Sequence, residues 1–254
     1  MSFYHEHGRH DLPWRTDVSA YGVFVSEIML QQTQVSRVVM KYPQWLARFG
    51  SFEALAAASV ADVIAAWQGL GYNRRALRLR EAAQMVVREF GGVLPSDPAE
   101  LVRLPGVGAN TAGSVAAFAY DEPVVFIETN IRRVFIHGFF ADQPDVHDKQ
   151  LLPLIEEALE REHPREWYWA LMDYGADLAK RVENPNRRSK HYAVQSKFEG
   201  SARQLRGEVL RQLLGGRKRL VELEIDDGRL PEVMAALVKE GFVTQTTDTF
   251  GLAK

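Results

Sequence analysis

The feature that most constrains this chain is a run of helical periodicity between Val18 and Ala170. Apolar residues recur there at spacings of three and four, and the breaks in the pattern fall at glycine or proline. Two boundaries carry cap signals: Ser59 precedes one helix, and Gly91-Gly92 follows the helix expected over Arg74 to Phe90. The sequence therefore predicts a mainly α fold built from short helices.

Further helices are expected in the same region. They are one through Phe24, Ile28 and Leu30 to Val35, two short ones between Phe52 and Trp67, one that begins near Pro98 with Asp97 as its cap, and an apolar one from Thr111 to Ala119. Together these helices make up the first predicted domain, residues 1–180.

A polar, basic segment from Arg181 to Gly200 interrupts the periodicity, so we expect residues 181–200 to form a loop or linker. Beyond it, the pattern predicts helices over Gln204 to Leu214 and Leu230 to Lys239, followed by a hairpin around Thr247-Asp248. This order is typical of a winged helix, although other small α+β folds share it. Residues 201–254 are predicted to form a small winged-helix-like module.

Composition excludes several classes of protein. The 254 residues include no cysteine, which excludes disulfides, thiolate zinc sites and cysteine-held iron–sulfur clusters. The seven histidines show no spacing typical of a zinc site, so we expect no metal site. No run approaches the roughly 20 apolar residues of a membrane span, and the charged N-terminus is unlike a signal peptide. We therefore expect a cytoplasmic protein without membrane contact, and we separately expect a monomer.

Charge is distributed unevenly along the chain. Between Lys180 and Leu220 lie twelve basic and three acidic residues, whereas the remainder carries 19 basic and 30 acidic residues. The net charge of −2 thus conceals a basic stretch that could face a polyanion. A solvated charged stretch without a partner is an equally good interpretation of the run alone.

A glycine-rich turn, Leu104-Pro105-Gly106-Val107-Gly108, separates two of the predicted helices. We expect both glycines to adopt positive φ and to expose backbone amides beside the N-terminus of the next helix, where a phosphate can bind. Taken alone, such a turn is more often structural. The complete string is the form of a helix-hairpin-helix, which grips the DNA backbone without reading sequence. The residues expected to contact DNA here are Gly106, Gly108, Asn110 and Thr111.

Two carboxylates emerge from apolar segments. Glu27 lies in a largely apolar helix, where burial should raise its pKa and suit it to donate a proton near neutral pH. Glu128 ends an apolar run at the start of another helix, for which Asn130 is the expected N-cap. A structural hydrogen-bonding role is the simpler interpretation of either residue alone. Together with a phosphate clamp, however, they suit cleavage of an N-glycosidic bond in DNA, which needs one acid for the leaving base and one carboxylate for the sugar cation.

Several strings resemble the helix-hairpin-helix-Gly/Pro-Asp (HhH-GPD) superfamily of DNA glycosylases, and most closely its MutY-like, adenine glycosylase branch. They are SEIMLQQTQV, WQGLGYNRRALRLREAA, LPGVGANTAGSVAAFAY, NIRRV and WALMDYGA, spread between Leu12 and Ala179. The resemblance implies a two-lobed helical fold that binds damaged or mismatched duplex DNA, flips one nucleotide out and cleaves its glycosidic bond. It also implies a role in base excision repair at the nucleoid.

The resemblance assigns roles to individual residues. Glu27 aligns with the acid that protonates the adenine, and Glu128 takes the place of the catalytic aspartate. The residues aligned with positions that insert into the duplex, face the opposite base or stack are Gln32, Thr33, Leu70 and Tyr72.

Departures from the family pattern limit what can be carried over. The family's four cluster cysteines are absent, and we expect Arg187, Arg188 and Lys190 to supply the DNA contact that the cluster loop makes in relatives. The segment after residue 200 is too short for the Nudix-related domain that reads 8-oxoguanine in adenine glycosylases. Asn110 stands where bifunctional glycosylases carry a lysine, so a monofunctional enzyme without lyase activity is expected. A monovalent cation at the hairpin, common in the family, stays open.

The leading interpretation is thus a monofunctional DNA glycosylase that removes adenine from a purine mismatch, without a cofactor. One alternative is a glycosylase for uracil or thymine opposite guanine, or for an alkylated base. Another is a catalytically silent protein that binds DNA structure, in which Glu128 replaced the aspartate because cleavage is no longer required.

Overall fold

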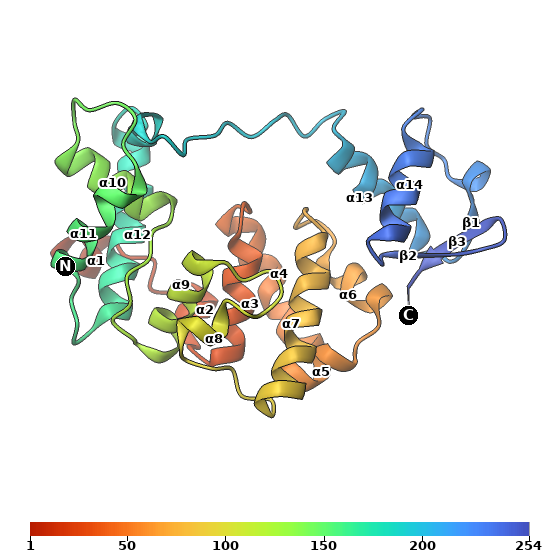
Figure 1. Cartoon of the computed structure of the whole chain (residues 1–254), viewed down its shortest axis with the longest axis horizontal. Helices are drawn as coiled ribbons and strands as arrows, with labels where there is room; N and C mark the ends of the chain where they lie inside the picture. Colours follow the sequence, from red (N-terminus) through yellow and green to blue (C-terminus); the bar gives the residue numbers. More distant parts are fainter. Residues whose placement is uncertain (254) are drawn as a thin grey trace. The chain divides into compact units, whose positions relative to one another are not determined.

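The computed structural model describes residues 1–253 and confirms the mainly α fold (Figure 1). Its α-helices are α1 (Ser2–His7), α2 (Pro13–Thr16), α3 (Ala20–Leu30), α4 (Val35–Arg48), α5 (Phe52–Ala57), α6 (Val60–Trp67), α7 (Arg74–Phe90), α8 (Pro98–Leu101), α9 (Ala109–Tyr120), α10 (Thr129–Phe139), α11 (Asp148–Ala158), α12 (Pro164–Arg181), α13 (Ala202–Leu213) and α14 (Leu230–Lys239). The 3₁₀ helices are η1 (Pro185–Arg188) and η2 (Leu220–Glu222), and the strands are β1 (Lys218–Arg219), β2 (Val243–Thr246) and β3 (Thr249–Leu252).

Most local boundaries follow the cap signals. The Ser59 side chain accepts a hydrogen bond from the Asp62 amide, and the Asp97 side chain accepts one from the Ala99 amide. Gly91 ends α7 in the left-handed conformation, with φ of 62°. These caps work as expected because each uses only neighbouring residues, so the surrounding fold has little influence on them.

The helix expected through Leu30 to Val35 is wrong. Helix α3 ends at Leu30 and α4 begins at Val35, with Gln32 between them in the left-handed region at φ of 54°. The Thr33 amide donates to the Leu30 carbonyl at 3.2 Å, which closes a tight turn. In this turn the polar side chains of the stretch can be solvated, whereas a continuous buried helix would remove them from water.

The chain forms two compact units. The first comprises Met1–Glu27, Leu94–Arg103 and Val107–Val194. Its apolar core lies around α9 to α12, where Phe126, Ile131 and Tyr168 are each 3% exposed or less. A Cβ added at Gly175 of α12 would lie 2.5 Å from the Asn130 carbonyl oxygen of α10, so glycine is needed for the close approach of these helices.

Part of the segment expected to be a loop packs against this first unit. Pro185 and Asn186 of η1 are buried, and the Asn186 side-chain amide donates to the Thr129 carbonyl at 2.9 Å. The Lys190 amide donates to the Val146 carbonyl at 3.0 Å. The start of the segment is therefore ordered by polar contacts that its composition does not reveal.

The second unit comprises Ile28–Val93, Leu104–Gly106 and the chain from Gln195 onward. In its helical part α5 and α6 pack on α7, and Trp45 meets Trp67 edge to face with ring centroids 5.5 Å apart. The C-terminal part joins α13 and α14 to an antiparallel sheet of order β1-β3-β2. The β2–β3 hairpin and both helices match the elements predicted for residues 201–254, and the winged-helix-like module stays a prediction.

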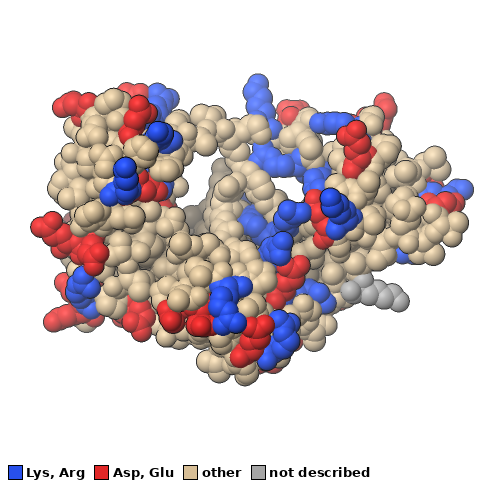
Figure 2. Space-filling view, viewed as in Figure 1, with Lys and Arg blue, Asp and Glu red and all other residues tan. Residues whose placement is uncertain are grey.

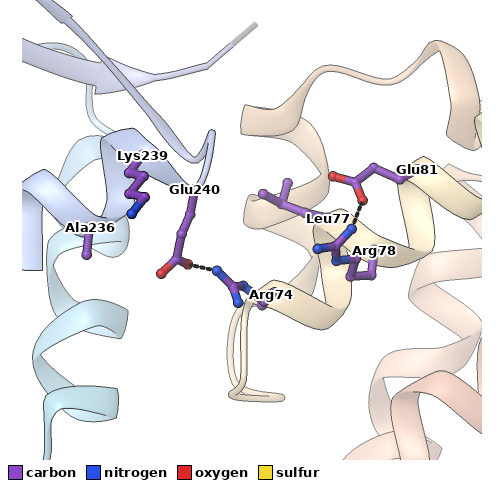
Figure 3. Close-up of a pocket in the computed structure, with 7 residues that line it drawn as sticks. All are labelled: Arg74, Leu77, Arg78, Glu81, Ala236, Lys239 and Glu240. Atoms are coloured by element: carbon purple, nitrogen blue, oxygen red, sulfur yellow. Dashed lines mark hydrogen bonds and ion pairs between the residues drawn. The ribbon is translucent and has the colours of Figure 1, made fainter. Parts of the chain in front are cut away.

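A groove of about 490 Å³ lies between α7 and α14 in the second unit (Figure 3). Arg74 and Arg78 of α7 line one side, and Lys239 and Glu240 line the other. No helix within residues 1–253 is long and apolar enough to cross a membrane. Figure 2 shows basic and acidic side chains beside one another over much of the face drawn, as the surface ion pairs also indicate.

Candidate functional site

Glu27 lies near the end of α3 and is partly buried. The Ser114 hydroxyl, on α9 and itself 5% exposed, donates to Glu27 Oε2 at 2.6 Å. The same hydroxyl lies 3.0 Å from the Thr111 carbonyl oxygen, to which it can donate when Glu27 carries a proton. Ser114 was not predicted as a site residue, because 87 positions separate it from Glu27 and nothing in its own helix marks it.

Burial raises the pKa of Glu27 from 4.5 to about 7. The Ser114 hydrogen bond opposes this rise, the charge of Glu128 adds to it, and the charge of Arg15 lowers it. The charge of Glu128 acts on Glu27, so the first unit places the Glu128 carboxylate near enough to affect the Glu27 pKa. A carboxyl group with this pKa is about half protonated near neutral pH, as a general acid requires.

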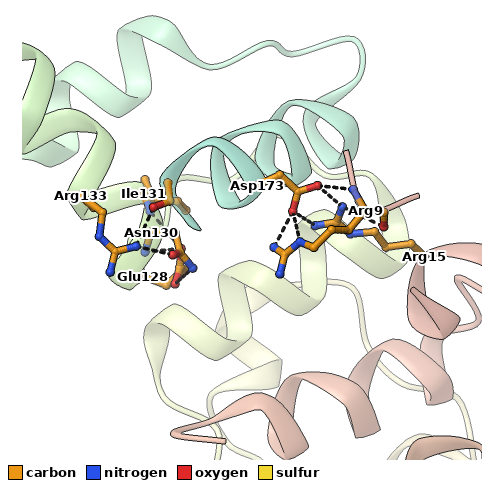
Figure 4. A network of polar contacts seen from close by, with 8 residues as sticks. Arg9, Arg15, Glu128, Asn130, Ile131, Arg133 and Asp173 are labelled. Atoms are coloured by element: carbon orange, nitrogen blue, oxygen red, sulfur yellow. Dashed lines mark hydrogen bonds and ion pairs between the residues drawn. The ribbon is translucent and has the colours of Figure 1, made fainter. Parts of the chain in front are cut away.

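Glu128 is the N-cap of α10, so the expectation that Asn130 caps this helix is wrong (Figure 4). Glu128 Oε1 accepts hydrogen bonds from the Asn130 amide at 2.7 Å and the Ile131 amide at 2.9 Å. Glu128 Oε2 accepts one from the Asn130 side chain at 3.2 Å. The extra methylene of glutamate lets the carboxylate fold back onto the two amides, which leaves Asn130 within the first turn.

Burial also raises the pKa of Glu128, while the two backbone amides, Arg132 and Arg133 lower it. Arg132 is itself paired with Asp148 at 2.7 Å. Arg133 donates to the Asn130 side chain at 2.8 Å and to the Gly175 carbonyl at 2.7 Å. These contacts fix the start of α10 and hold the Glu128 carboxylate at the positive end of the helix dipole, which favours its charged form.

Asn110 lies beside the same region. Its side-chain oxygen accepts a hydrogen bond from the Ile127 amide at 3.4 Å, next to Glu128 in the chain. Asn110 is exposed, and Thr111 is partly buried on the first turn of α9. The first unit therefore brings Glu27, Glu128 and Asn110 together.

One of the two hairpin glycines, Gly108, differs from the expectation. Gly106 has φ of 84°, and a Cβ there would lie 2.9 Å from Arg78 Cβ, so both conformation and space require glycine. Gly108 has φ of −95° and ψ of 173°, so the positive φ expected for it is wrong. Gly108 is the N-cap of α9, and its extended backbone is a conformation that any residue can adopt. Since it has no side chain to cap the helix, α9 begins without a side-chain cap at an exposed position.

The second unit holds four more of the predicted DNA-contacting residues, Gln32, Thr33, Leu70 and Tyr72. There the partly buried Arg75 joins their segments. Arg75 Nη1 donates to the Ile28 and Met29 carbonyls at 2.8 and 2.9 Å. Arg75 Nη2 donates to Thr33 Oγ1 at 2.8 Å and to the Leu70 carbonyl at 3.1 Å. Burial lowers the pKa of Arg75 to about 10, which leaves it charged. Arg75 was not predicted, since an arginine in a polar helix carries no distinguishing signal.

Exposure differs among these residues. Gln32 is exposed, whereas Leu70 is 3% exposed and lies in the core of the second unit, so it would have to leave that core to enter a duplex. Tyr72 is partly buried and has φ of 47°, an uncommon conformation for a bulky residue. In the basic segment, Lys190 is exposed, and Arg187 pairs with Glu183 at 2.7 Å. Arg188 is partly buried.

No group of three or more His, Cys, Asp or Glu side chains within residues 1–253 could hold a metal ion. The iron–sulfur cluster of related glycosylases does not fit this chain, because the sequence offers no thiolate to bind iron.

Comparison with known proteins defines the class. Residues 25–159 match the family model described as HhH-GPD superfamily base excision DNA repair protein, and this chain belongs to that family. It is 35% identical to an adenine DNA glycosylase from Mycobacterium tuberculosis over 96% of this chain and 89% of the relative. It is 49% identical to the adenine DNA glycosylase of Mycolicibacterium smegmatis over 57% of this chain and 50% of that protein.

Solved structures show the same fold. A thermostable thymine-DNA glycosylase matches with a TM-score of 0.63 at 26% identity, over 69% of this chain and 82% of the other. Endonuclease III in a non-covalent DNA complex matches with a TM-score of 0.53 at 18% identity, over 68% of this chain and 78% of the other. The HhH-GPD fold that the sequence motifs imply is thereby confirmed.

Proposed function

We propose that this protein is a DNA N-glycosylase that removes adenine from mismatched duplex DNA. The observation that carries the proposal is the pair formed by Glu27, whose pKa is about 7, and Glu128 at the start of α10. The names of the bacterial relatives support adenine as the base, because the similarity to one of them extends over 96% of the chain.

The two carboxyl groups divide the reaction. Protonated Glu27 donates its proton to the departing adenine as the bond between the base nitrogen and C1′ breaks and its electron pair moves to the base. Ionised Glu128 stabilises the positive charge that develops on the sugar. Water then adds to C1′ and gives up a proton, so the products are free adenine and an abasic site.

We further propose that the strand is left uncut. Asn110 occupies the position of the lyase lysine, and its amide nitrogen is not nucleophilic enough to form a Schiff base with the sugar. The substrate is duplex DNA, with phosphate contacts at the start of α9 and from Arg187, Arg188 and Lys190. No cofactor takes part.

Thymine opposite guanine is the second candidate base, because a thymine-DNA glycosylase is among the similar structures. A panel of duplexes that each carry one mismatch or lesion separates the candidates. We expect excision of adenine opposite guanine or 8-oxoguanine, seen as strand breaks only after alkaline treatment. Excision of thymine alone contradicts the adenine proposal, and breaks without alkali contradict the monofunctional one.

Glu128→Gln tests the role of the second carboxyl group. We expect excision to be lost while affinity for the mismatched duplex stays within about tenfold, because the charge acts on the sugar cation rather than on phosphate. Glutamine keeps an oxygen that can cap α10, so the helix start is preserved. Glu122→Gln, an exposed change six residues earlier, is the matched control. Undiminished single-turnover rates in Glu128→Gln contradict the assignment.

A further inference from the structure

The C-terminal part of the second unit contacts the Tyr72 turn directly. The Arg203 guanidinium, on α13, donates to the Tyr72 hydroxyl and lies 5.1 Å from the centroid of its ring. The Gln195 side-chain amide, which precedes α13, donates to the same hydroxyl. A residue with positive φ and a bulky side chain keeps that conformation only when its surroundings hold it. Arg203 and Gln195 supply such contacts from a segment more than 120 positions away.

A second contact joins the same helix to the start of α7. Glu240 accepts hydrogen bonds from Arg206 of α13 at 2.5 and 3.2 Å, and it pairs with Arg74 of α7 at 3.2 Å (Figure 3). The Glu240 side chain is only 19% exposed, so solvent weakens these contacts less than at an open surface. Without it, the two arginines would face each other uncompensated.

The two contacts act on the same short piece of chain. Arg203 and Arg206 lie three residues apart on α13 and so share one face of that helix. Tyr72 and Arg74 are two residues apart at the start of α7. We call this set, Arg203, Arg206 and Glu240 on Tyr72 and Arg74, the turn latch.

We propose that the turn latch makes the C-terminal module a positioning element for Tyr72, and that Arg203 thereby sets discrimination of the base opposite the one excised. This inference rests on the proposed function and on the sequence resemblance, which aligns Tyr72 with a position that stacks within the duplex. The chemistry at Glu27 and Glu128 belongs to the first unit, whereas every residue of the latch belongs to the second. The latch therefore changes which duplex is accepted more than how fast the bond breaks.

Arg203→Ala tests the proposal. We expect the preference for the best opposite base over the next best to fall at least fivefold, through weaker binding of the preferred duplex, with its single-turnover rate within about twofold. Arg211→Ala is the matched control, since Arg211 lies on the same helix but, within residues 1–253, donates its hydrogen bonds to Glu208 alone. An unchanged preference in Arg203→Ala overturns the proposal.

A double-mutant cycle asks whether Arg203 acts through the Tyr72 hydroxyl. Tyr72→Phe keeps the ring and removes only the hydroxyl, so the double variant should lose little more preference than either single variant. Fully additive losses overturn the positioning role.

A readout without activity keeps the test independent of the proposed function. We expect trypsin to cut after the exposed Lys197 at least fivefold faster in Glu240→Gln than in Arg211→Ala, because the module is held less firmly. Equal cleavage rates overturn the latch. If the unmodified protein excises no base from the panel, the proposed function fails. The latch is then judged by affinity for mismatched over matched duplex, and an unchanged ratio in Arg203→Ala overturns it.

Discussion

Two regions of the first unit shift the pKa of a carboxyl group in opposite directions. Asp173, on α12, is 4% exposed and accepts hydrogen bonds from the Arg9 amide, Arg9 Nε and two Arg15 nitrogens at 2.7 to 3.0 Å (Figure 4). These contacts hold the pKa of Asp173 below its ordinary value. Glu27 has the Ser114 hydroxyl as its hydrogen-bond partner among the described residues, and its pKa rises to about 7.

The contrast indicates separate roles for the two carboxyl groups. The same unit has the means to stabilise a buried anion, and it does so at Asp173, where the pair of arginines joins the N-terminal segment to α12. At Glu27 it leaves the burial penalty in place, although Arg15 is near enough to affect the pKa of both groups. A cost in stability that the fold could have relieved is typical of a catalytic group.

The largest effect is expected at Glu27 itself. Glu27→Gln removes the proton donor while keeping an oxygen for Ser114, so single-turnover excision should fall by about 10² to 10⁴. Glu122→Gln, which is exposed, should retain full activity. If Glu27→Gln excises adenine at an undiminished rate, the contrast with Asp173 has no catalytic meaning.

Asp173→Asn should instead damage the fold. It leaves the guanidiniums of Arg9 and Arg15 without their anion, and the Arg15 side chain is only 4% exposed. Removing one partner of such a buried pair costs about 3–5 kcal/mol of unfolding free energy. The loss should appear in urea titrations above pH 4 and shrink as the pH falls further, because a lowered carboxyl pKa stabilises the fold only where the group is ionised. A variant as stable as the unmodified protein would show that the arginines are not needed as a clamp.

The sign of the stability change should reverse at Glu27. A pKa raised from 4.5 to about 7 means that the folded protein binds the proton more tightly, so the charged group costs stability as pH rises through this range. Glu27→Gln removes that cost and should be more stable by about 1–3 kcal/mol above pH 7, with little difference near pH 4.5. Thermal melts of both proteins at pH 5 and pH 8 measure this. A variant that is less stable at pH 8 contradicts the unrelieved burial of Glu27.

The sequence predicted these two regions unequally. The apolar residues around Glu27 were sufficient to predict its raised pKa, because they show that the helix carrying Glu27 packs into the core. Its Ser114 partner and the arginines that contact Asp173 were not predictable. Arg9 and Asp173 lie 164 positions apart, and a sequence does not distinguish an arginine in a buried ion pair from one at the surface. Helix caps also divide into those that the sequence predicts and those that it does not. Ser59 and Gly91 were predicted from their neighbours, whereas the choice between Glu128 and Asn130 depends on how a side chain folds back.

The smallest expected effect concerns Ser114 and separates its role from that of a packing residue. Its hydrogen bond lowers the pKa of Glu27, so Ser114→Ala should raise that pKa by about one pH unit, the value of a hydrogen bond to a charged group. The protonated acid is the active form, so excision falls as pH rises through the Glu27 pKa, and this alkaline limb should move upward by the same amount. Ser26→Ala is the matched control, because the Ser26 hydroxyl is also buried but donates to the Val23 carbonyl of its own helix at 2.9 Å. Rates measured between pH 5.5 and pH 9 decide the outcome. A limb that stays in place in Ser114→Ala, or that moves equally in both variants, shows that Ser114 does not tune the proton donor.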